Sequence, residues 1–124
     1  MQLRCVIVDD DEEFLKVAQA LLEGDGVTVA GVAHNSAEGV QRTQALGPDV
    51  VLIDIRLGRE SGFEAARRLA ENGHPAALIM ISAHADEDYA ELIAESPATG
   101  FLPKTELSAA AIRRILGTAY RPGQ

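Results

Sequence analysis

Five short apolar runs, separated by segments of helical periodicity, constrain the fold of this 124-residue chain more than any other feature. The runs are mostly continuous in Val, Ile and Leu rather than alternating, and cover residues 3–8, 27–33, 50–54, 77–82 and 100–102. Continuous apolar strands are typical of a parallel sheet that is covered on both faces. The chain is therefore predicted to be an α/β protein with helices on both faces of one sheet.

Apolar residues at helical spacing predict a helix after each strand. These helices are expected at residues 14–22, 36–46, 62–72, 86–95 and 108–119. Asn35 and Glu38 can form a capping pair at the start of the second helix, and Gly47 marks its end. The alternation of strand and helix contains no repeat or linker, which predicts one domain over residues 1–124.

The composition excludes several classes of function. A net charge of −8, from 19 acidic and 11 basic residues, argues against direct nucleic-acid binding by this domain. No apolar run approaches the roughly 20 residues of a membrane span, and the absence of a signal-peptide pattern predicts a cytoplasmic protein.

Cys5 is the only cysteine and is expected to be a buried, inert thiol. His34 and His74 have no evident partners and are expected on surface loops.

Charged and polar residues follow most of the predicted strands. Right-handed crossovers place every loop that follows a strand at the carboxyl edge of the sheet. The residues at these positions are Asp9, Asp10, Asp11, Asp54, Ser82 and Lys104. If the second strand is an outer strand and the first and third are neighbours, these side chains converge on one spot.

A group of carboxylates is unfavourable unless a cation or a proton relieves the repulsion. Oxygen ligands at an open sheet edge suit Mg²⁺, and the lack of His or Cys among them argues against zinc. Lys104 and Ser82 add an ammonium and a hydroxyl on the far side. Such groups around one carboxylate can hold a phosphoryl group, with the carboxylate as the nucleophile that forms an acyl phosphate.

Four motifs, taken together in their order along the chain, resemble the receiver domain of two-component response regulators. The resemblance covers nearly the whole chain. "VIVDDD" resembles the acidic pair after the first strand, and "VVLIDIRLGRESG" resembles the phosphoacceptor strand and loop. "LIMISA" resembles the segment of the switch hydroxyl, and "GFLPK" that of the switch aromatic residue and lysine. The resemblance implies a (βα)5 receiver fold, a five-stranded parallel sheet with its strands in the order 2-1-3-4-5.

The resemblance also implies a metal site and a phosphoacceptor. Asp54 would accept a phosphoryl group from a sensor histidine kinase in a Mg²⁺-dependent reaction. Asp10, Asp54 and the backbone carbonyl of Arg56 would bind Mg²⁺ directly, with Asp9 in the same acidic site. Asp11 is expected to be a solvated residue or an acid of the first helical turn, where the helix dipole favours it.

Further roles follow from the same resemblance. Lys104 and Ser82 would contact the phosphoryl group, and Ser82 would move on activation. Phe101 matches the switch aromatic residue, although an inert core Phe is the alternative. Arg56 and His84 would tune the lifetime of the acyl phosphate, or be ordinary exposed loop residues.

Two positions depart from the family pattern. Gly58 stands where a proline is common, which predicts a more mobile loop after Asp54. Thr105 stands where a proline often follows the lysine, which leaves the Lys104–Thr105 bond open to either a cis or a trans form.

Two other functions compete with the phosphoacceptor switch. One is a pseudo-receiver that binds a partner without phosphorylation, which the complete set of site residues argues against. The other is a Mg²⁺-dependent aspartyl phosphohydrolase, which needs an acid two residues after the nucleophile, where Arg56 stands.

The sequence does not identify what lies downstream. The resemblance implies an output face made by the fourth helix, the fifth strand and the fifth helix. The printed chain ends in "AYRPGQ", shortly after that helix, which leaves open a stand-alone receiver or part of a DNA-binding regulator. Arg and acidic residues of the fourth and fifth helices leave a homodimer open as well.

Overall fold

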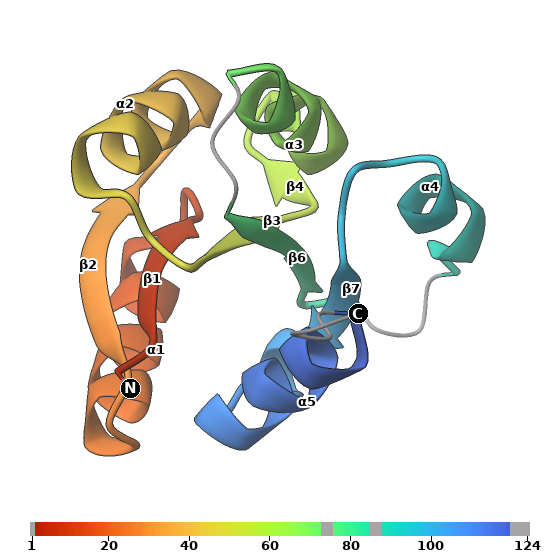
Figure 1. The fold of residues 1–124 in the computed structure, drawn as a ribbon. Helices are drawn as coiled ribbons and strands as arrows, with labels where there is room; N and C mark the ends of the chain where they lie inside the picture. Colours follow the sequence, from red (N-terminus) through yellow and green to blue (C-terminus); the bar gives the residue numbers. More distant parts are fainter. Residues whose placement is uncertain (1, 73–75, 85–87, 120–124) are drawn as a thin grey trace.

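The fold is one parallel sheet between two helical layers (Figure 1). The computed structural model describes residues 2–72, 76–84 and 88–119. The sheet has the order β2-β1-β3-β6-β7, with the strands β1 (Arg4–Val8), β2 (Thr28–Ala33), β3 (Val50–Asp54), β6 (Ala77–Ser82) and β7 (Gly100–Pro103). This is the predicted 2-1-3-4-5 order, because β4 and β5 form a separate hairpin and do not enter the sheet.

Both faces of the sheet are covered, as the continuous apolar runs predict. Helices α1 (Glu12–Gly24) and α5 (Ala109–Ala119) lie on one face, and α2 (Ser36–Leu46), α3 (Gly62–Glu71) and α4 (Ala90–Ala94) lie on the other (Figure 1). Along β1 the side chains alternate between the two layers: Cys5 and Ile7 pack with α1 and α5, and Val6 and Val8 pack with α3. All four are fully buried.

Side chains cap the helices close to the predicted starts. The Asp11 carboxylate accepts hydrogen bonds from the backbone N–H groups of Glu13 and Phe14, at 3.0 and 3.3 Å. Asn35 accepts from the N–H of Glu38 at 2.9 Å, so half of the predicted capping pair is present. The Glu38 carboxylate instead accepts from the N–H of His34. Within the described ranges, no helix is long and apolar enough to span a membrane.

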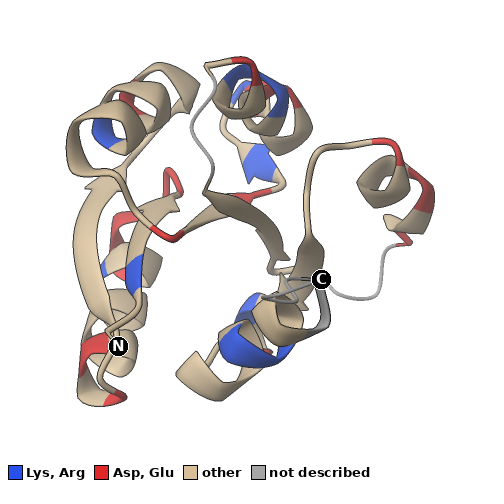
Figure 2. Cartoon of the chain, viewed as in Figure 1, with Lys and Arg blue, Asp and Glu red and all other residues tan. Residues whose placement is uncertain are grey.

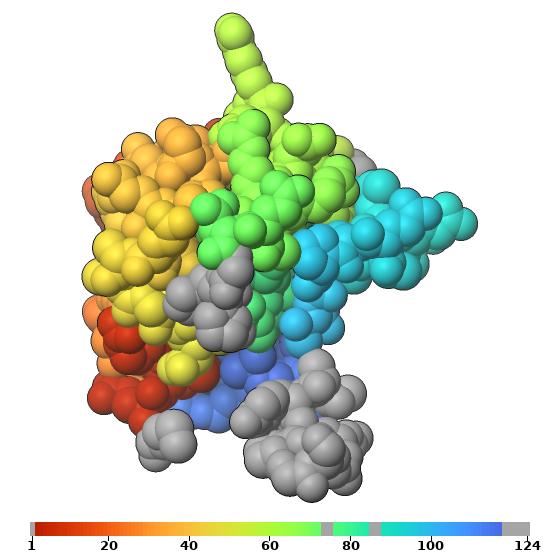
Figure 3. All heavy atoms as spheres, turned by 45° about the horizontal axis from the view of Figure 1, so that its top comes forward, coloured from red at the N-terminus to blue at the C-terminus, as the bar shows by residue number. Residues whose placement is uncertain are grey.

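The fourth helix is shorter than predicted. It begins at Ala90, whose N–H donates to the Asp88 carboxylate at 3.0 Å, and it ends at Ala94. Residues 85–87, where the sequence predicts its start, lie outside the described residues, as does His74. No residue of α4 is buried, and Figure 3 shows this segment projecting from the rest of the surface.

The loop after β3 contains a hairpin that the sequence patterns do not predict. Strands β4 (Arg56–Leu57) and β5 (Glu60–Ser61) pair antiparallel around a turn in which Gly58 has a φ of +59°. A positive φ is readily adopted by glycine and is closed to proline. The segment expected to be a mobile loop therefore has regular pairing.

The segment after β7 contains Thr105, the second position that departs from the family pattern. Peptide bonds throughout the described ranges are trans, including Lys104–Thr105. The chain then continues into a short 3-10 helix, η1 (Lys104–Glu106).

Gly62 closes the β4–β5 hairpin directly behind Asp54. Its N–H donates to the carbonyl of Ile55 at 2.7 Å. A Cβ added at this position would lie 2.0 Å from the backbone oxygen of Asp54. Only a glycine allows α3 to start so close to the end of β3.

We expect Gly62→Ala to lower the free energy of unfolding by about 3 kcal/mol, because the new methyl group meets backbone that cannot rotate away. Gly24→Ala is the matched control, since no atom lies within 4 Å of a Cβ at Gly24. That variant should remain within about 1 kcal/mol of the parent. Urea unfolding of both variants measures the difference, and equal stabilities would contradict the predicted clash.

Candidate functional site

Three carboxylates from neighbouring strands meet at the carboxyl edge of the sheet. Asp54 ends β3, and Asp9 and Asp10 follow β1, whose Val8 is the register partner of Ile53. Each of the three offers an oxygen, and these oxygens lie within 4.8 Å of one another. Asp9 is fully buried, Asp54 is 7% exposed and Asp10 is exposed. We call these three residues the acidic cluster.

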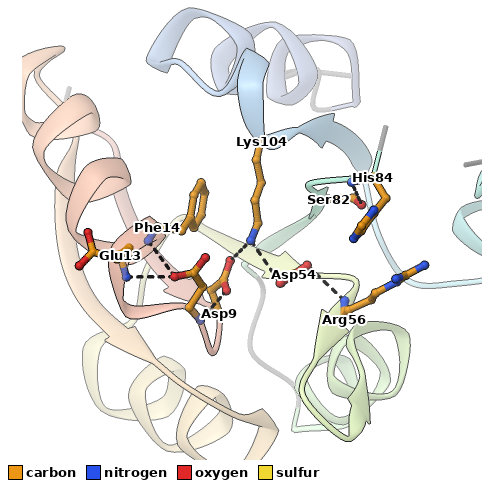
Figure 4. Close-up of polar contacts among 9 residues, drawn as sticks. Asp9, Glu13, Phe14, Asp54, Arg56, Ser82, His84 and Lys104 are labelled. Carbon is orange, nitrogen blue, oxygen red and sulfur yellow. Dashed lines mark hydrogen bonds and ion pairs between the residues drawn. The ribbon is translucent and has the colours of Figure 1, made fainter. Parts of the chain in front are cut away.

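Lys104 reaches the acidic cluster from the end of β7 (Figure 4). Its Nζ lies 2.7 Å from Oδ2 of Asp9 and 3.3 Å from Oδ2 of Asp54. The ammonium also lies 4.3 Å from the centroid of the Phe14 ring. Burial disfavours the ammonium, but hydrogen bonds and attraction to the two carboxylates outweigh this effect and raise the pKa of Lys104. Lys104 is therefore a partly buried cation that offsets part of the negative charge.

The ionised form of the Asp54 carboxylate is clearly disfavoured by its surroundings. Burial, followed by the charge of Asp9, raises the pKa of Asp54 to about 6. The N–H of Arg56, 3.2 Å from Oδ1, and the Lys104 ammonium act in the opposite direction but do not cancel the shift. A cation close to Asp54 would relieve this repulsion.

Ser82 and His84 lie on the next strand and the loop that follows it. Ser82 is buried, and it directly follows Ile81, the register partner of Asp54. The Ser82 hydroxyl accepts from the N–H of His84 at 2.9 Å, just as Asp54 accepts from the N–H of Arg56. Figure 4 shows the Arg56 and His84 side chains on the opposite side of Asp54 from Asp9. Both side chains are exposed.

Phe101 lies in a row of aromatic rings on the α3 side of the sheet. Its centroid is 6.2 Å from that of Tyr89, which lies 6.5 Å from the Phe63 ring. Phe101 is only partly buried. Tyr89 is absent from the sequence predictions, and the one available signal is an aromatic residue among acidic ones just before α4.

Asp11 and His34 lie near the acidic cluster but have other partners. Asp11 caps α1, as expected of a first-turn acid, and donates its N–H to Oδ1 of Asp9 at 2.9 Å. His34, expected to have no partner, contacts the carboxylates of Glu12 and Glu38. The hydrogen bond to Glu38 is the main cause of a raised pKa of His34.

The donor set of the acidic cluster fits a hard divalent cation. Within the described ranges, Asp9, Asp10 and Asp54 are the one group of at least three carboxylate, imidazole or thiolate residues close enough to share an ion. All three offer oxygen, and one of them is exposed to solvent. Such a set suits Mg²⁺, which binds a few carboxylates and keeps several waters.

Asp54 should make the stability of the metal-free protein depend on pH. A folded-state pKa near 6 lies above the ordinary value of about 4, so ionised Asp54 costs stability above pH 6. Asp54→Asn should therefore raise the free energy of unfolding at pH 7 by about 2 kcal/mol. The gain should disappear near pH 4, where Asp54 is protonated when folded. Chemical denaturation at both pH values tests this, and a gain independent of pH would contradict it.

Comparison with known proteins identifies relatives of the whole domain. The family described as the response regulator receiver domain matches residues 5–116. A protein-glutamate methylesterase/protein-glutamine glutaminase of Natronomonas pharaonis is 35% identical over 94 residues, which cover 76% of this chain and 26% of that protein. The DNA-binding transcriptional activator EvgA of Escherichia coli is 26% identical over 104 residues, covering 84% of this chain and 51% of EvgA. The chain thus spans between a quarter and a half of these relatives.

Solved structures show the same fold. The signal receiver domain of a modulated diguanylate cyclase from Desulfovibrio desulfuricans superposes with a TM-score of 0.78 at 30% identity, covering 96% of this chain and 94% of that one. The response regulator domain of Thermotoga maritima CheB superposes with a TM-score of 0.77 at 25% identity, covering 98% and 100%. With the family match over residues 5–116, these likenesses show that the chain belongs to the response regulator receiver domain family of two-component systems.

Proposed function

We propose that residues 1–124 form one cytoplasmic receiver domain that works as a Mg²⁺-dependent phosphoacceptor switch. Asp54 accepts the phosphoryl group from the phosphohistidine of a sensor histidine kinase. The observation that carries the proposal is the position of Asp54 at the end of β3, beside Asp9 and Asp10 and 3.3 Å from the Lys104 ammonium. The domain promotes its own phosphorylation and dephosphorylation and turns over no diffusible metabolite.

The transfer is a displacement at phosphorus. A carboxylate oxygen of Asp54 forms a bond to phosphorus while the P–N bond of the phosphohistidine breaks and its electron pair returns to the imidazole. The product is an acyl phosphate. Lys104, already 3.3 Å from Asp54, supplies a fixed positive charge for the added phosphoryl oxygens.

Asp10, Asp54 and the Arg56 carbonyl would hold Mg²⁺, with Asp9 in the same site. Bound Mg²⁺ would supply positive charge that offsets the repulsion between the Asp54 carboxylate and the incoming phosphoryl group. Asp9 contributes in a second way, because its ion pair keeps the Lys104 ammonium in the site.

The switch begins at Ser82. Its hydroxyl, now an acceptor for the N–H of His84, would donate to a phosphoryl oxygen, and the loop after β6 would follow. Phe101 would then turn inward and change the face made by α4, β7 and α5. Figure 2 shows acidic residues on α4 and basic residues on α5. A downstream partner, or a second copy of the chain, would bind this face.

Arg56 and His84 would set the lifetime of the acyl phosphate. Their side chains are exposed. The backbone N–H of Arg56 donates to the Asp54 carboxylate, and that of His84 donates to the Ser82 hydroxyl. In these positions they would flank the path of the water that hydrolyses the acyl phosphate.

Asp54→Asn should abolish phosphorylation by a histidine kinase or a small phosphodonor, because the nucleophilic oxygen is lost. Asp49→Asn is the matched control. Asp49 lies just before Val50, the first residue of β3, and its carboxylate accepts from the N–H of Arg4. The control should be labelled like the parent. Labelling is followed by intact-protein mass, and undiminished labelling of Asp54→Asn would overturn the proposal. Steady phosphate release from a small phosphoester would favour a phosphohydrolase instead.

Phosphorylation should also need the metal. We expect EDTA to stop labelling, and Mg²⁺ to restore it. Asp10→Asn should weaken Mg²⁺ binding by about tenfold or more, because one charged ligand is lost. A Mg²⁺ titration followed by NMR measures the affinity. Labelling that continues in EDTA, or an unchanged affinity in Asp10→Asn, would contradict the proposed metal site.

A further inference from the structure

A second polar cluster lies beside the acidic cluster and shares no residue with it. It consists of Ser36 from α2, Glu60 from β5 and Arg68 from α3. The N–H of Ser36 donates to Oε1 of Glu60 at 3.0 Å, and the Ser36 hydroxyl donates to Oε2. Arg68 donates to the Ser36 hydroxyl at 2.9 Å, and its Nη1 lies 3.9 Å from Glu60. Ser36 is 1% exposed, so its polar atoms depend on these partners.

Glu60 acts as a second cap of α2, in addition to Asn35, whose side chain accepts from the N–H of Glu38. Ser36 is the first residue of α2, and the first N–H groups of a helix have no partner within the helix. The partial positive charge at this end also favours a carboxylate. The hydrogen bond from the Ser36 hydroxyl is the main cause of a lowered pKa of Glu60, which keeps this carboxylate charged at neutral pH. Glu60 is thus fixed by a helix that begins 24 residues earlier in the chain.

The hairpin transmits this fixed position to the acidic cluster. Glu60 is the register partner of Leu57, which is buried and directly follows Arg56. The N–H of Arg56 donates to Asp54. The turn residue Gly58 lies against Asp10, since a Cβ at Gly58 would be 3.3 Å from Oδ2 of Asp10. Strand β5 is therefore held at α2 through Glu60. Strand β4 contacts Asp54 through Arg56, and the turn lies against Asp10 at Gly58.

We propose that Glu60 is a positioning residue for the metal site. Its bonds to Ser36 hold the β4–β5 hairpin so that the Arg56 carbonyl stays beside Asp54. The inference rests on the proposed function in one respect, namely that the Arg56 carbonyl is a Mg²⁺ ligand. Without Glu60, the hairpin keeps its covalent ends and its pairing but loses its attachment to α2.

The test uses the full 124-residue protein and Mg²⁺ itself. Glu60→Ala removes the attachment. Glu64→Ala is the matched control, because Glu64 is an exposed glutamate of α3 that lies 3.7 Å from Arg67 and away from Ser36. Two readouts are recorded: backbone amide hydrogen exchange of Arg56 to Gly58 in metal-free protein, and the Kd for Mg²⁺ from NMR titration. We expect Glu60→Ala to speed exchange at these amides and to raise the Kd about tenfold, and Glu64→Ala to change neither.

Ser36→Ala provides a second route if Glu60→Ala does not fold. It removes the hydroxyl bond to Glu60 and keeps the backbone N–H bond, so it should raise the Kd by less than Glu60→Ala. The double variant should lose little more than Glu60→Ala, because the Ser36 hydroxyl acts on the hairpin through Glu60. Glu60→Gln keeps an acceptor for the N–H of Ser36 and should recover part of the affinity.

The outcomes separate this inference from the proposed function. If the parent binds Mg²⁺ and Glu60→Ala binds it with the same Kd, the positioning role is wrong and the phosphoacceptor site stands. If exchange at Arg56 to Gly58 is unchanged while overall stability falls, Glu60 is only a structural residue. If the parent itself does not bind Mg²⁺, the proposed function fails and this inference fails with it.

Discussion

The ion pairs of Lys104 with Asp9 and Asp54 are the interaction on which the site depends. Asp9 is fully buried, and an unpaired buried carboxylate would cost several kcal/mol. Lys104 comes from the far end of β7, so its contacts join the edge strand of the sheet to β1 and β3. The charge is only partly balanced, because Asp9 and Asp54 share one ammonium and Asp10 adds a third carboxylate. The fold therefore holds a region of excess negative charge around Asp54, the proposed phosphoacceptor.

The sheet and the acidic cluster follow from the sequence because local patterns identify the strands, and parallel pairing then brings the strand ends together. Cys5 and Ile7 pack on one helical layer and Val6 and Val8 on the other, which is why the run "CVIV" has no polar alternation. Once the strands are parallel, the residues after each strand must share one edge. The meeting of Asp9, Asp10 and Asp54 needs only that β1 and β3 pair.

Features that depend on contacts between distant residues escape the sequence. The two-residue strands β4 and β5 are too short to show a period, and Ser36 gives no sign that its partner is Glu60. His34 finds its carboxylates through the packing of α1 and α2 around β2. Helix α4 buries none of its residues, so no apolar stripe fixes where it starts. For Ser36 and His34, a side chain from another element supplies the contact.

The row of rings formed by Phe63, Tyr89 and Phe101 has a consequence for how a signal could leave the site. Protein interiors are close-packed, so a ring can enter an occupied space only when another group leaves it. Phe101 has no hydroxyl, and Tyr89 lies directly beside it. An inward turn of Phe101 would change its contact with the Tyr89 ring, and Tyr89 adjoins the first residue of α4. The signal would then pass from Phe101 to Tyr89 through ring packing. Helix α4, which buries none of its residues, would move in response.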